Sequence, residues 1–310
     1  MSTPLPPLQP ITLLSPTTIR ILAHNPSKFT LQGTNTYLVG SGSSRYLIDT
    51  GEGKPEWLAS LKQALATYTP NADGTPITLA GVLLTHWHRD HIGGVADVLR
   101  TWPGTKIWKR KRQEEEGSGH PDDELAHDWQ AEEIVDGQVF AVPGATLTAV
   151  ATPGHTTDHT VFVLREENAL FTGDNVLGHG TSVFEDLSAY VGSLDKMRGL
   201  FPAGKTGRGY PGHGDLVEDG RARIEEYIRH RAMREEQVVR TLREGGEMTA
   251  MEIVAVIYKD VAESLHPAAA HGVMLILKKL EKEGRVMVVE GEEEEKWRLV
   301  KGGAAGRSAL

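Results

Sequence analysis

A cluster of histidine and aspartate near residue 90 constrains this chain more than any other feature. Residues 85–91 read Thr-His-Trp-His-Arg-Asp-His, so four potential metal ligands fall within six positions. An apolar run at 81–84 precedes them, and Gly93, Gly94 and a helical pattern follow. This order predicts a buried strand that ends in a ligand-bearing loop, which a helix then closes. Imidazole and carboxylate suit a borderline-soft divalent cation, and zinc is the first expectation.

Three later segments carry further donors in a similar local setting. Thr-Pro-Gly-His at 152–155, Thr-Gly-Asp at 172–174 and Pro-Gly-His at 211–213 each end a short apolar segment with residues that permit tight turns. A lone His-x-His would indicate an ordinary solvated loop. The recurrence of metal-compatible side chains in all four segments is very unlikely to arise by chance. The candidate ligands, sufficient for two metal ions that share one carboxylate, are His86, His88, Asp90, His91, His155, Asp174 and His213.

The donor pattern resembles the metallo-β-lactamase superfamily, whose His-x-His-x-Asp-His signature matches residues 86–91. Phe-Thr-Leu-Gln-Gly-Thr-Asn-Thr-Tyr at 29–37, Leu-Ile-Asp-Thr-Gly-Glu at 47–52 and Gly-His-Gly-Thr-Ser-Val-Phe-Glu-Asp at 178–186 resemble one branch of it. That branch contains the beta-lactamase-like protein 2 group, whose animal members are mitochondrial endoribonucleases, and fungal thioesterases that release polyketides from carrier proteins. The resemblance runs from about Ile19 to about Leu299, and it is specific for the superfamily rather than for a substrate.

The resemblance implies an α/β (α+β) fold, an αββα sandwich in which helices cover two mixed sheets. Alternating extended and helical patterns agree with it. Strands are predicted near 19–22, 36–39, 46–48, 160–164 and 169–172, and helices after Pro55 and from Asp219 to about Arg243. We expect a catalytic domain over residues 17–245.

The two ends of the chain predict separate structures. Residues 246–300 indicate a small winged-helix-like module, with two apolar helical patterns and a two-stranded hairpin. Seven glutamates between 281 and 295 would repel phosphate, which favours packing or a substrate lid over DNA binding. Residues 1–16 predict a flexible N-terminal arm and residues 301–310 a disordered tail. The charged stretch 109–137, which includes His120 and His127, predicts a solvated loop rather than a substrate-contacting flap.

Composition narrows the other possibilities. The chain of 310 residues has no cysteine, which excludes disulfides and thiolate ligands. Its formal net charge of -9 argues against coating nucleic acid by bulk electrostatics, although a local basic groove is compatible with it. The N-terminus lacks the features of a secretory or transit peptide, and no run approaches the roughly 20 apolar residues that span a bilayer. We therefore expect a cytoplasmic protein with no membrane partner.

The resemblance also implies how the seven donors divide. One metal ion would be held by His86, His88 and His155. The other would be held by Asp90, His91 and His213, and Asp174 would bridge the two ions. The expected cofactor is two Zn²⁺ ions with a bridging hydroxide, because zinc lowers the pKa of coordinated water from about 15.7 to about 7. Asp90 is the expected catalytic residue, which can protonate the leaving group. No Gly-x-Ser-x-Gly indicates a serine nucleophile instead.

Three further residues are candidates for supporting roles. Asp49 and His159 could orient metal-bound imidazoles from outside, as metal sites commonly require. The alternatives are a turn cap for Asp49 and a core polar residue for His159. We favour the orienting role for Asp49, because Leu-Ile-Asp-Thr-Gly follows a predicted strand, and leave both open for His159. His179 either lines the substrate mouth or lies in a flexible surface loop.

The ligand set serves carbonyl and phosphoryl centres alike, so the substrate is left open. We favour hydrolysis of acyl (polyketide-type) thioesters on an acyl carrier protein, since a thiolate leaves without an acid and the chain is acidic. The alternative is an endoribonuclease that cleaves single-stranded RNA with the same centre. Hydrolysis of a glutathione thioester is a third possibility, weakened by the different C-terminal module. An inactive scaffold is disfavoured, because none of the seven donors is missing.

Overall fold

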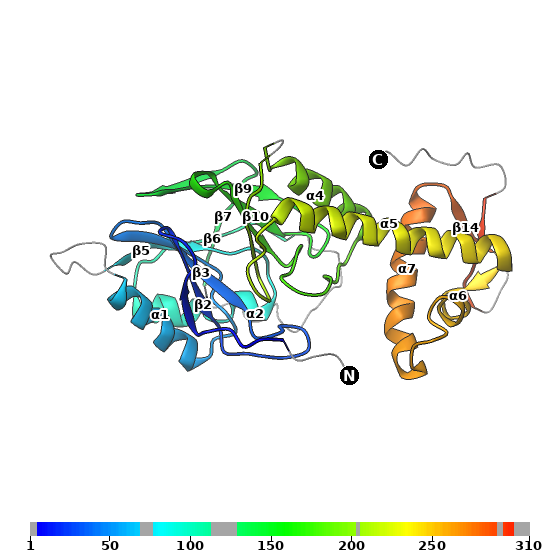
Figure 1. The fold of residues 1–310 in the computed structure, drawn as a ribbon, viewed down its shortest axis with the longest axis horizontal. Helices are drawn as coiled ribbons and strands as arrows, with labels where there is room; N and C mark the ends of the chain where they lie inside the picture. The colour runs from blue at the N-terminus through cyan, green and yellow to red at the C-terminus, as the bar shows by residue number, and fades with distance from the viewer. Residues whose placement is uncertain (1–4, 69–76, 113–128, 203–204, 290–293, 301–310) are drawn as a thin grey trace.

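The computed structural model describes residues 5–68, 77–112, 129–202, 205–289 and 294–300. Two mixed β-sheets face each other between helices, and a smaller module lies at one end (Figure 1). This arrangement confirms the predicted αββα sandwich with its C-terminal winged-helix module. None of the helices in the described part of the chain is both long and apolar enough to cross a membrane.

The first sheet is built in chain order. Its strands pair antiparallel from β1 to β4 and parallel from β4 to β7. Every residue of β2 and β3 is buried, because the sheet is covered on both faces. The strand that was predicted to deliver the histidine cluster is β5. The seven strands are β1 (Ile11–Leu13), β2 (Thr18–Leu22), β3 (Asn35–Val39), β4 (Ser44–Ile48), β5 (Thr78–Leu83), β6 (Ile107–Lys109) and β7 (Glu132–Glu133).

The flexible arm predicted over residues 1–16 is wrong for its last part. Ile11–Leu13 forms β1 at the edge of the first sheet, with Ile11 opposite Ile21 of β2. Ile11 also packs against the core beneath that sheet. Backbone pairing and a half-buried apolar side chain therefore hold a segment whose composition indicated disorder. Residues 1–4 lie outside the described residues.

The solvated loop predicted over 109–137 is also wrong at both ends. Lys109 ends β6, and its ammonium group pairs with the buried carboxylate of Asp158. Glu132–Glu133 forms β7 beside β6. Edge strands often carry charged side chains, so a short edge strand is hard to recognise within a charged stretch of sequence. His120 and His127 lie outside the described residues.

The second sheet has the order β12-β11-β10-β9-β8 and packs on the first through a shared core. Tyr37 and Leu83 of the first sheet meet Phe162, Phe171 and Tyr210 of the second in this core. These strands are β8 (Val139–Val142), β9 (Ala145–Ala151), β10 (Thr160–Leu164), β11 (Ala169–Gly173) and β12 (Gly209–Pro211). The first sheet's outer face meets α1 (Pro55–Thr67), α2 (Arg89–Ile92) and α3 (Val95–Thr101), and the second sheet's meets α4 (Leu187–Gly199) and α5 (Gly220–Gly245).

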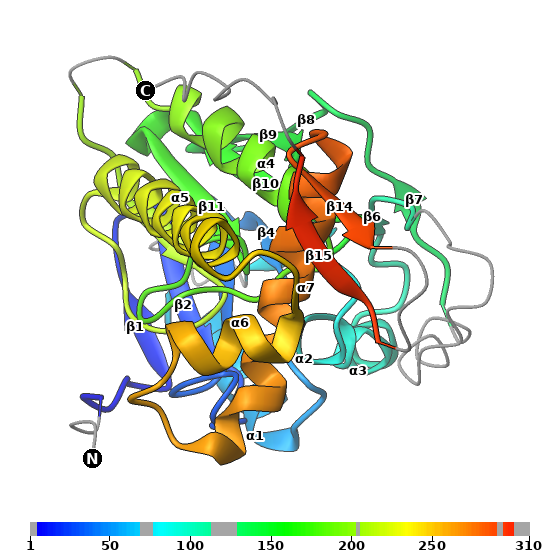
Figure 2. The same ribbon diagram turned by 90° about the vertical axis from the view of Figure 1, so that its right-hand side faces the viewer.

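The C-terminal module is joined to the sandwich by α5 (Figure 2). Val238 and Leu242 of α5 share one hydrophobic core with Ile253, Leu277 and Trp297 of the module. The division between domains at residue 245 therefore stays a prediction, since the core is continuous across it. Residues 301–310, predicted to be a tail, lie outside the described residues. The module contains β13 (Met248–Thr249), α6 (Ala250–Ile257), α7 (His266–Lys282), β14 (Val286–Val289) and β15 (Lys296–Leu299).

Candidate metal centre

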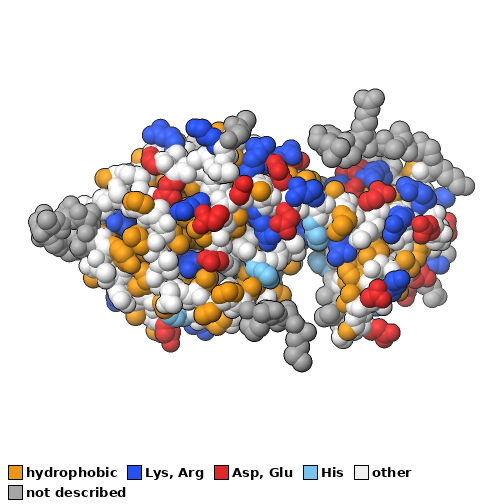
Figure 3. Space-filling model, in the orientation of Figure 1, with side chains coloured by type: hydrophobic (Ala, Val, Ile, Leu, Met, Phe, Trp, Pro, Cys, Tyr) orange, Lys and Arg blue, Asp and Glu red, His pale blue; other side chains and the backbone are white. Residues whose placement is uncertain are grey.

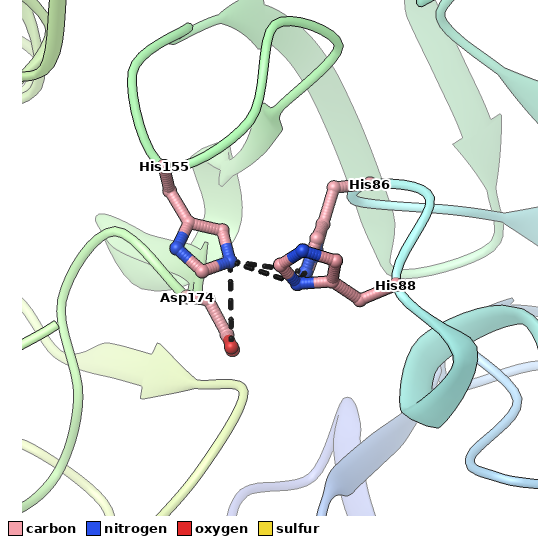
Figure 4. A group of neighbouring side chains, drawn as sticks. All are labelled: His86, His88, His155 and Asp174. Carbon is pink, nitrogen blue, oxygen red and sulfur yellow. Dashed lines mark hydrogen bonds and ion pairs between the residues drawn. The ribbon is translucent and has the colours of Figure 1, made fainter. Parts of the chain in front are cut away.

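The structure brings all seven predicted donors to one edge of the sandwich. The donors follow β5, β9, β11 and β12, and the turns after these strands point them at one another. They form two groups, and within each group one ligand atom of every residue lies within 4.8 Å of the others. Figure 4 shows the first group, in which the rings of His86, His88 and His155 converge above the Asp174 carboxylate. The second group is Asp90, His91 and His213.

Hydrogen bonds fix which nitrogen of His86 carries a proton. The Thr85 hydroxyl donates to Asp49 Oδ2 at 2.8 Å, and the oxygen of this hydroxyl lies 2.9 Å from His86 Nδ1. Because a hydroxyl has one proton, His86 Nδ1–H must donate to Thr85. His86 Nε2 therefore presents a lone pair to the site. His155 Nδ1–H donates to the Val183 carbonyl at 2.8 Å, so His155 Nε2 also presents a lone pair.

The three-histidine group fits a cation. His86 Nε2 and His88 Nδ1 are 3.0 Å apart, and His155 Nε2 is 3.2 Å from each. One proton on His88 Nδ1 could bridge only one of these contacts at a time, whereas a cation satisfies all three. Tetrahedral zinc with Zn–N distances of about 2.0–2.1 Å would separate its nitrogens by about 3.3–3.4 Å, close to the observed values.

Burial keeps these three histidines neutral. Burial, followed by the neighbouring His155, lowers the pKa of His88 to about 3. Burial and neighbouring imidazoles hold the pKa of His86 well below its ordinary value, and burial lowers the pKa of His155. Neutral imidazole is the form that binds metal, so this group is ready to accept a cation at neutral pH.

The second group combines histidines with carboxylates. His91 Nε2 lies 3.3 Å from Asp90 Oδ2 and 3.4 Å from Asp174 Oδ1. His213 Nε2 lies 3.2 Å from Asp90 Oδ2 and 3.1 Å from Asp174 Oδ2. Burial lowers the pKa of His213, but the charges of Asp174 and Asp90 outweigh it and raise this pKa to about 9. In the metal-free protein His213 therefore carries a proton in the place that a cation would take.

Asp174 lies between the two groups. Its Oδ2 is 3.7 Å from His155 Nε2 and 3.1 Å from His213 Nε2. Asp174 Oδ1 and His91 Nε2 are both buried and have no hydrogen-bond partner among the described residues. Buried polar atoms normally have partners, and a divalent cation between the groups would supply one. The side chains present thus fit a divalent metal centre.

Asp49 orients the donors from outside, as the sequence predicts. Its carboxylate accepts hydrogen bonds from His91 Nδ1, from the Thr85 hydroxyl and from the Thr85 backbone N–H, each at 2.8 Å. The bond from His91 turns Nε2 of that ring towards the carboxylates of the second group. The Asp49 backbone lies in the left-handed region, at φ 59°, which residues other than glycine rarely adopt.

His159 is an orienting group and not only a core residue. Its Nε2 accepts the Asp174 backbone N–H at 3.1 Å, and its Nδ1 donates to the Thr152 hydroxyl at 2.9 Å. Burial, and then the nearby His155, hold the pKa of His159 well below its ordinary value, so Nε2 stays an acceptor. His179 is exposed and belongs to neither donor group, so its role at the substrate mouth stays a prediction.

Sequence reasoning missed two residues that orient Asp90. The Thr34 hydroxyl donates to Asp90 Oδ2 at 2.9 Å. Asn25 Nδ2 donates to the same hydroxyl at 3.0 Å, and Asn25 Oδ1 accepts the Thr34 backbone N–H at 2.9 Å. The hydroxyl proton is therefore directed at Asp90. Thr34 lies in the Gln-Gly-Thr-Asn-Thr stretch, which carried the resemblance but no assigned role.

A cavity of about 440 Å³ adjoins the metal centre. Its lining includes His88 and Asp90 on one side and the loop that carries Phe29 on the other. Phe29 is 69% exposed, and the Lys28 ammonium group lies 4.7 Å from the centroid of its ring. Val183, whose carbonyl holds His155, is 66% exposed. Two apolar side chains thus lie exposed near the donors.

Comparisons with known proteins agree with this fold. The family model described as Metallo-beta-lactamase superfamily matches residues 29–229, and the one described as Beta-lactamase associated winged helix domain matches residues 249–297. The chain is 41% identical over 303 residues to a Beta-lactamase-like protein 2 homolog of Caenorhabditis elegans, covering 96% of this chain and 95% of that protein. It is 43% identical over 272 residues to an Atrochrysone carboxyl ACP thioesterase of Aspergillus chevalieri, covering 86% of this chain and 80% of that one.

A solved structure supports the fold over the whole chain. A beta-lactamase domain protein from Burkholderia ambifaria superimposes with a TM-score of 0.76 at 18% identity. The match covers 94% of this chain and 93% of that chain, so it includes the C-terminal module as well as the sandwich.

Proposed function

This chain belongs to the metallo-beta-lactamase superfamily and is a hydrolase of that fold, and we propose that it cleaves acyl thioesters carried by an acyl carrier protein. The observation that carries the proposal is the cavity beside His88 and Asp90 with the exposed Phe29 ring on its wall. An aromatic side chain there offers apolar surface to a polyketide-type acyl group next to the metal centre. The relative named as an ACP thioesterase supports the same substrate class.

We assign the donors to two zinc ions as the sequence predicts. The three-histidine group would hold one ion, Asp90, His91 and His213 the other, and Asp174 both. Bound zinc supplies a Lewis acid and lowers the pKa of water to about 7. Asp49 and Thr85 keep the donor nitrogens turned inward, so that no reorganisation is needed when the substrate binds.

Asp90 is the proposed catalytic residue. Burial raises its pKa, but His91 and His213 outweigh this and hold the pKa well below its usual range, so the carboxylate is ionised. Thr34 fixes the position of Oδ2. The ionised carboxylate can then accept a hydrogen bond from the attacking water. As the water oxygen bonds to the acyl carbon and the C–S bond breaks, the proton passes by way of Asp90 to the departing sulfur, which is the stronger base. Because a thiol has an ordinary pKa of about 8.5, the thiolate leaves without a stronger acid, whereas the alkoxide of an RNA strand requires one.

The test compares the zinc-loaded wild-type protein with Asp90→Asn. We expect the wild type to release the acyl group from a polyketide-like thioester on a carrier protein, and the variant to lose about 10²–10⁴-fold in rate. Asp97→Asn is the matched control, since this aspartate pairs with Arg100 on α3 outside the metal centre and should keep the wild-type rate.

Single-stranded RNA is the second substrate in the same assay. RNA that stays intact beside a cleaved thioester supports the proposal. RNA cleavage that Asp90→Asn abolishes, with an untouched thioester, would replace it with the endoribonuclease alternative.

A further inference from the structure

A second cavity, of about 710 Å³, lies between the sandwich and the C-terminal module. One wall is α7 of the module, and the others are the start of α4, residues 153–157 and the segment that follows β6. The space-filling view shows the molecule notched between the sandwich and the module, with charged and histidine side chains at the border (Figure 3). The cavity is therefore formed by both parts of the chain.

Basic side chains dominate the charged lining. Arg110, Arg112, Lys278, Lys279 and Lys282 line the cavity, against Glu185 and Asp186 as the acidic residues. This balance is opposite in sign to the formal net charge of -9 of the whole chain. Because the protein as a whole is acidic, a surface patch with no binding role would be expected to be acidic too. A local basic surface therefore indicates recognition of an anion.

Part of this charge is already used within the protein. Lys279 pairs with Glu235 and Glu283, each at 2.6 Å, and Lys282 pairs with Asp186 at 2.8 Å. The pair with Glu235 joins α7 to α5 and the pair with Asp186 joins it to the start of α4, whereas the pair with Glu283 lies within the module. Lys278, on the same helix, is exposed, and Arg110 and Arg112 extend the basic wall from β6. Lys278 and Arg110 are the residues that we expect to meet an external anion.

A neutral donor in the cavity favours the same kind of ligand. The first turn of α4 does not supply it, because the Asp186 carboxylate caps that turn and accepts the Ala189 backbone N–H at 3.0 Å. The Thr157 hydroxyl is buried and has no hydrogen-bond partner within the described ranges, although Thr157 lines the cavity. A phosphate oxygen would satisfy such a hydroxyl.

The cavity adjoins the metal centre through two residues. Gly154, in its lining, immediately precedes His155. The Arg112 guanidinium lies 4.0 Å from the centroid of the Trp87 ring, and Trp87 stands between His86 and His88 in the chain. The second cavity therefore approaches the loops that carry His86, His88 and His155, while the cavity with Phe29 is lined by His88 and Asp90.

We propose that this second cavity binds the phosphodiester of a pantetheine arm that presents the acyl thioester to the metal centre. The proposal rests on the proposed function and extends it, since it names the group by which the carrier-bound substrate is recognised. One phosphodiester matches the few basic residues available. The chain as a whole, with its acidic excess, is less suited to the many phosphates of a nucleic acid.

The test is a binding measurement that needs no turnover. Dissociation constants of 4′-phosphopantetheine and of pantetheine are measured by calorimetry on the zinc-loaded protein. The wild type should bind the phosphorylated compound about tenfold more tightly or better, as expected for charge-assisted hydrogen bonds. Lys278→Glu and Arg110→Glu should bring the ratio of the two constants towards one. Lys62→Glu, the same charge change on an exposed residue of α1, should keep the wild-type ratio.

The outcomes separate this inference from the proposed function. Equal binding of the two compounds by the wild type, or a ratio that neither variant changes, overturns the phosphate site even where thioesters are hydrolysed. A tight, phosphate-dependent ratio supports the site even where the thioester assay fails. A labelled single-stranded RNA is titrated in parallel. Loss of RNA binding in Lys278→Glu, with no preference for phosphopantetheine, would assign the basic wall to nucleic acid and contradict the proposal.

Discussion

The two donor groups differ in the protons that they hold before a metal binds. His86, His88 and His155 have lowered pKa values and are neutral at neutral pH. His91 and His213 face carboxylates that outweigh the effect of burial and raise their pKa values. A group with a raised pKa is protonated below that pKa, and it must lose its proton to bind a cation. Two adjacent sites of one centre thus lose their protons in different pH ranges, the first group below neutral pH and the second above it.

This difference predicts how many protons are released on loading. At pH 7.5 the metal-free protein should release about three protons as it binds zinc, two from the histidines of the second group and one from the water that becomes the bridging hydroxide. Calorimetry in buffers with different ionisation enthalpies measures the number. The contribution of His213 should vanish as the pH rises through its pKa of about 9. His213→Ala should lower the release at pH 7.5, whereas an unchanged release in this variant would contradict the assigned protonation states.

At the scale of single residues, sequence reasoning found the donors but not the groups that orient them through hydroxyls. The donors are rare side chains in a diagnostic spacing, and Asp49 follows a strand that an apolar run predicts. Thr34 and Asn25 gave no comparable signal, because threonine and asparagine are common in turns for local reasons. Their role depends on a contact between Thr34 and Asp90, 56 positions apart in the chain.

At the scale of elements, the turns after strands place the donors, and one glycine is indispensable there. Gly212 lies between the end of β12 and His213. A Cβ at this position would collide with Asp174 Oδ1 and lie 3.0 Å from His91 Cε1. Only glycine therefore allows the backbone of this turn to approach the Asp174 carboxylate so closely.

Gly212→Ala should accordingly displace Asp174 and lower the zinc content below that of the wild type. We expect a loss of about 100-fold in rate, the size of effect that a misplacement of about 1 Å can cause. Metal analysis and steady-state kinetics measure both. Gly192→Ala is the control, because a Cβ there, on α4, meets nothing within 4 Å. Wild-type zinc content and rate in Gly212→Ala would refute the close approach.

Elements with a strong apolar period were predictable from the sequence, and edge strands were not. Strands β2, β3 and β5, helix α1 and helix α5 follow from their apolar patterns and, for α1, from a proline at its first position. Edge strands β1 and β7 escaped prediction because they are only three and two residues long, with β7 exposed and β1 no more than half-buried. Their pairing depends on the neighbouring strand and not on their own sequence.

At the scale of the whole molecule, one hydrophobic core joins the second sheet to the C-terminal module. Tyr190 and Leu194 of α4, Leu242 of α5 and Leu277 and Trp297 of the module belong to it. The sequence predicted the module from its apolar patterns, but it could not show that α5 carries the core across. Lys282 adds an ion pair with Asp186 at the start of α4. The module therefore packs against the sandwich, in agreement with the predicted packing role.

Trp297→Ala tests this continuity. Trp297 is 2% exposed, and its removal should cost about 3–5 kcal/mol of unfolding free energy because it leaves a large cavity. Urea unfolding followed by circular dichroism should show a single transition that shifts as a whole. Met287→Ala, at a side chain that is 41% exposed, should shift it little. A separate early transition for the module, with the sandwich unaffected, would contradict a shared core.

If the seven donors hold two zinc ions that serve thioester hydrolysis, activity must follow the metal content of the protein. Zinc is titrated into metal-free protein while release of the acyl group from a carrier-bound thioester is followed. We expect no turnover without metal and a rate that rises until two zinc ions are bound per chain. Full activity in the metal-free protein, or two bound zinc ions without any thioester cleavage, would contradict this expectation.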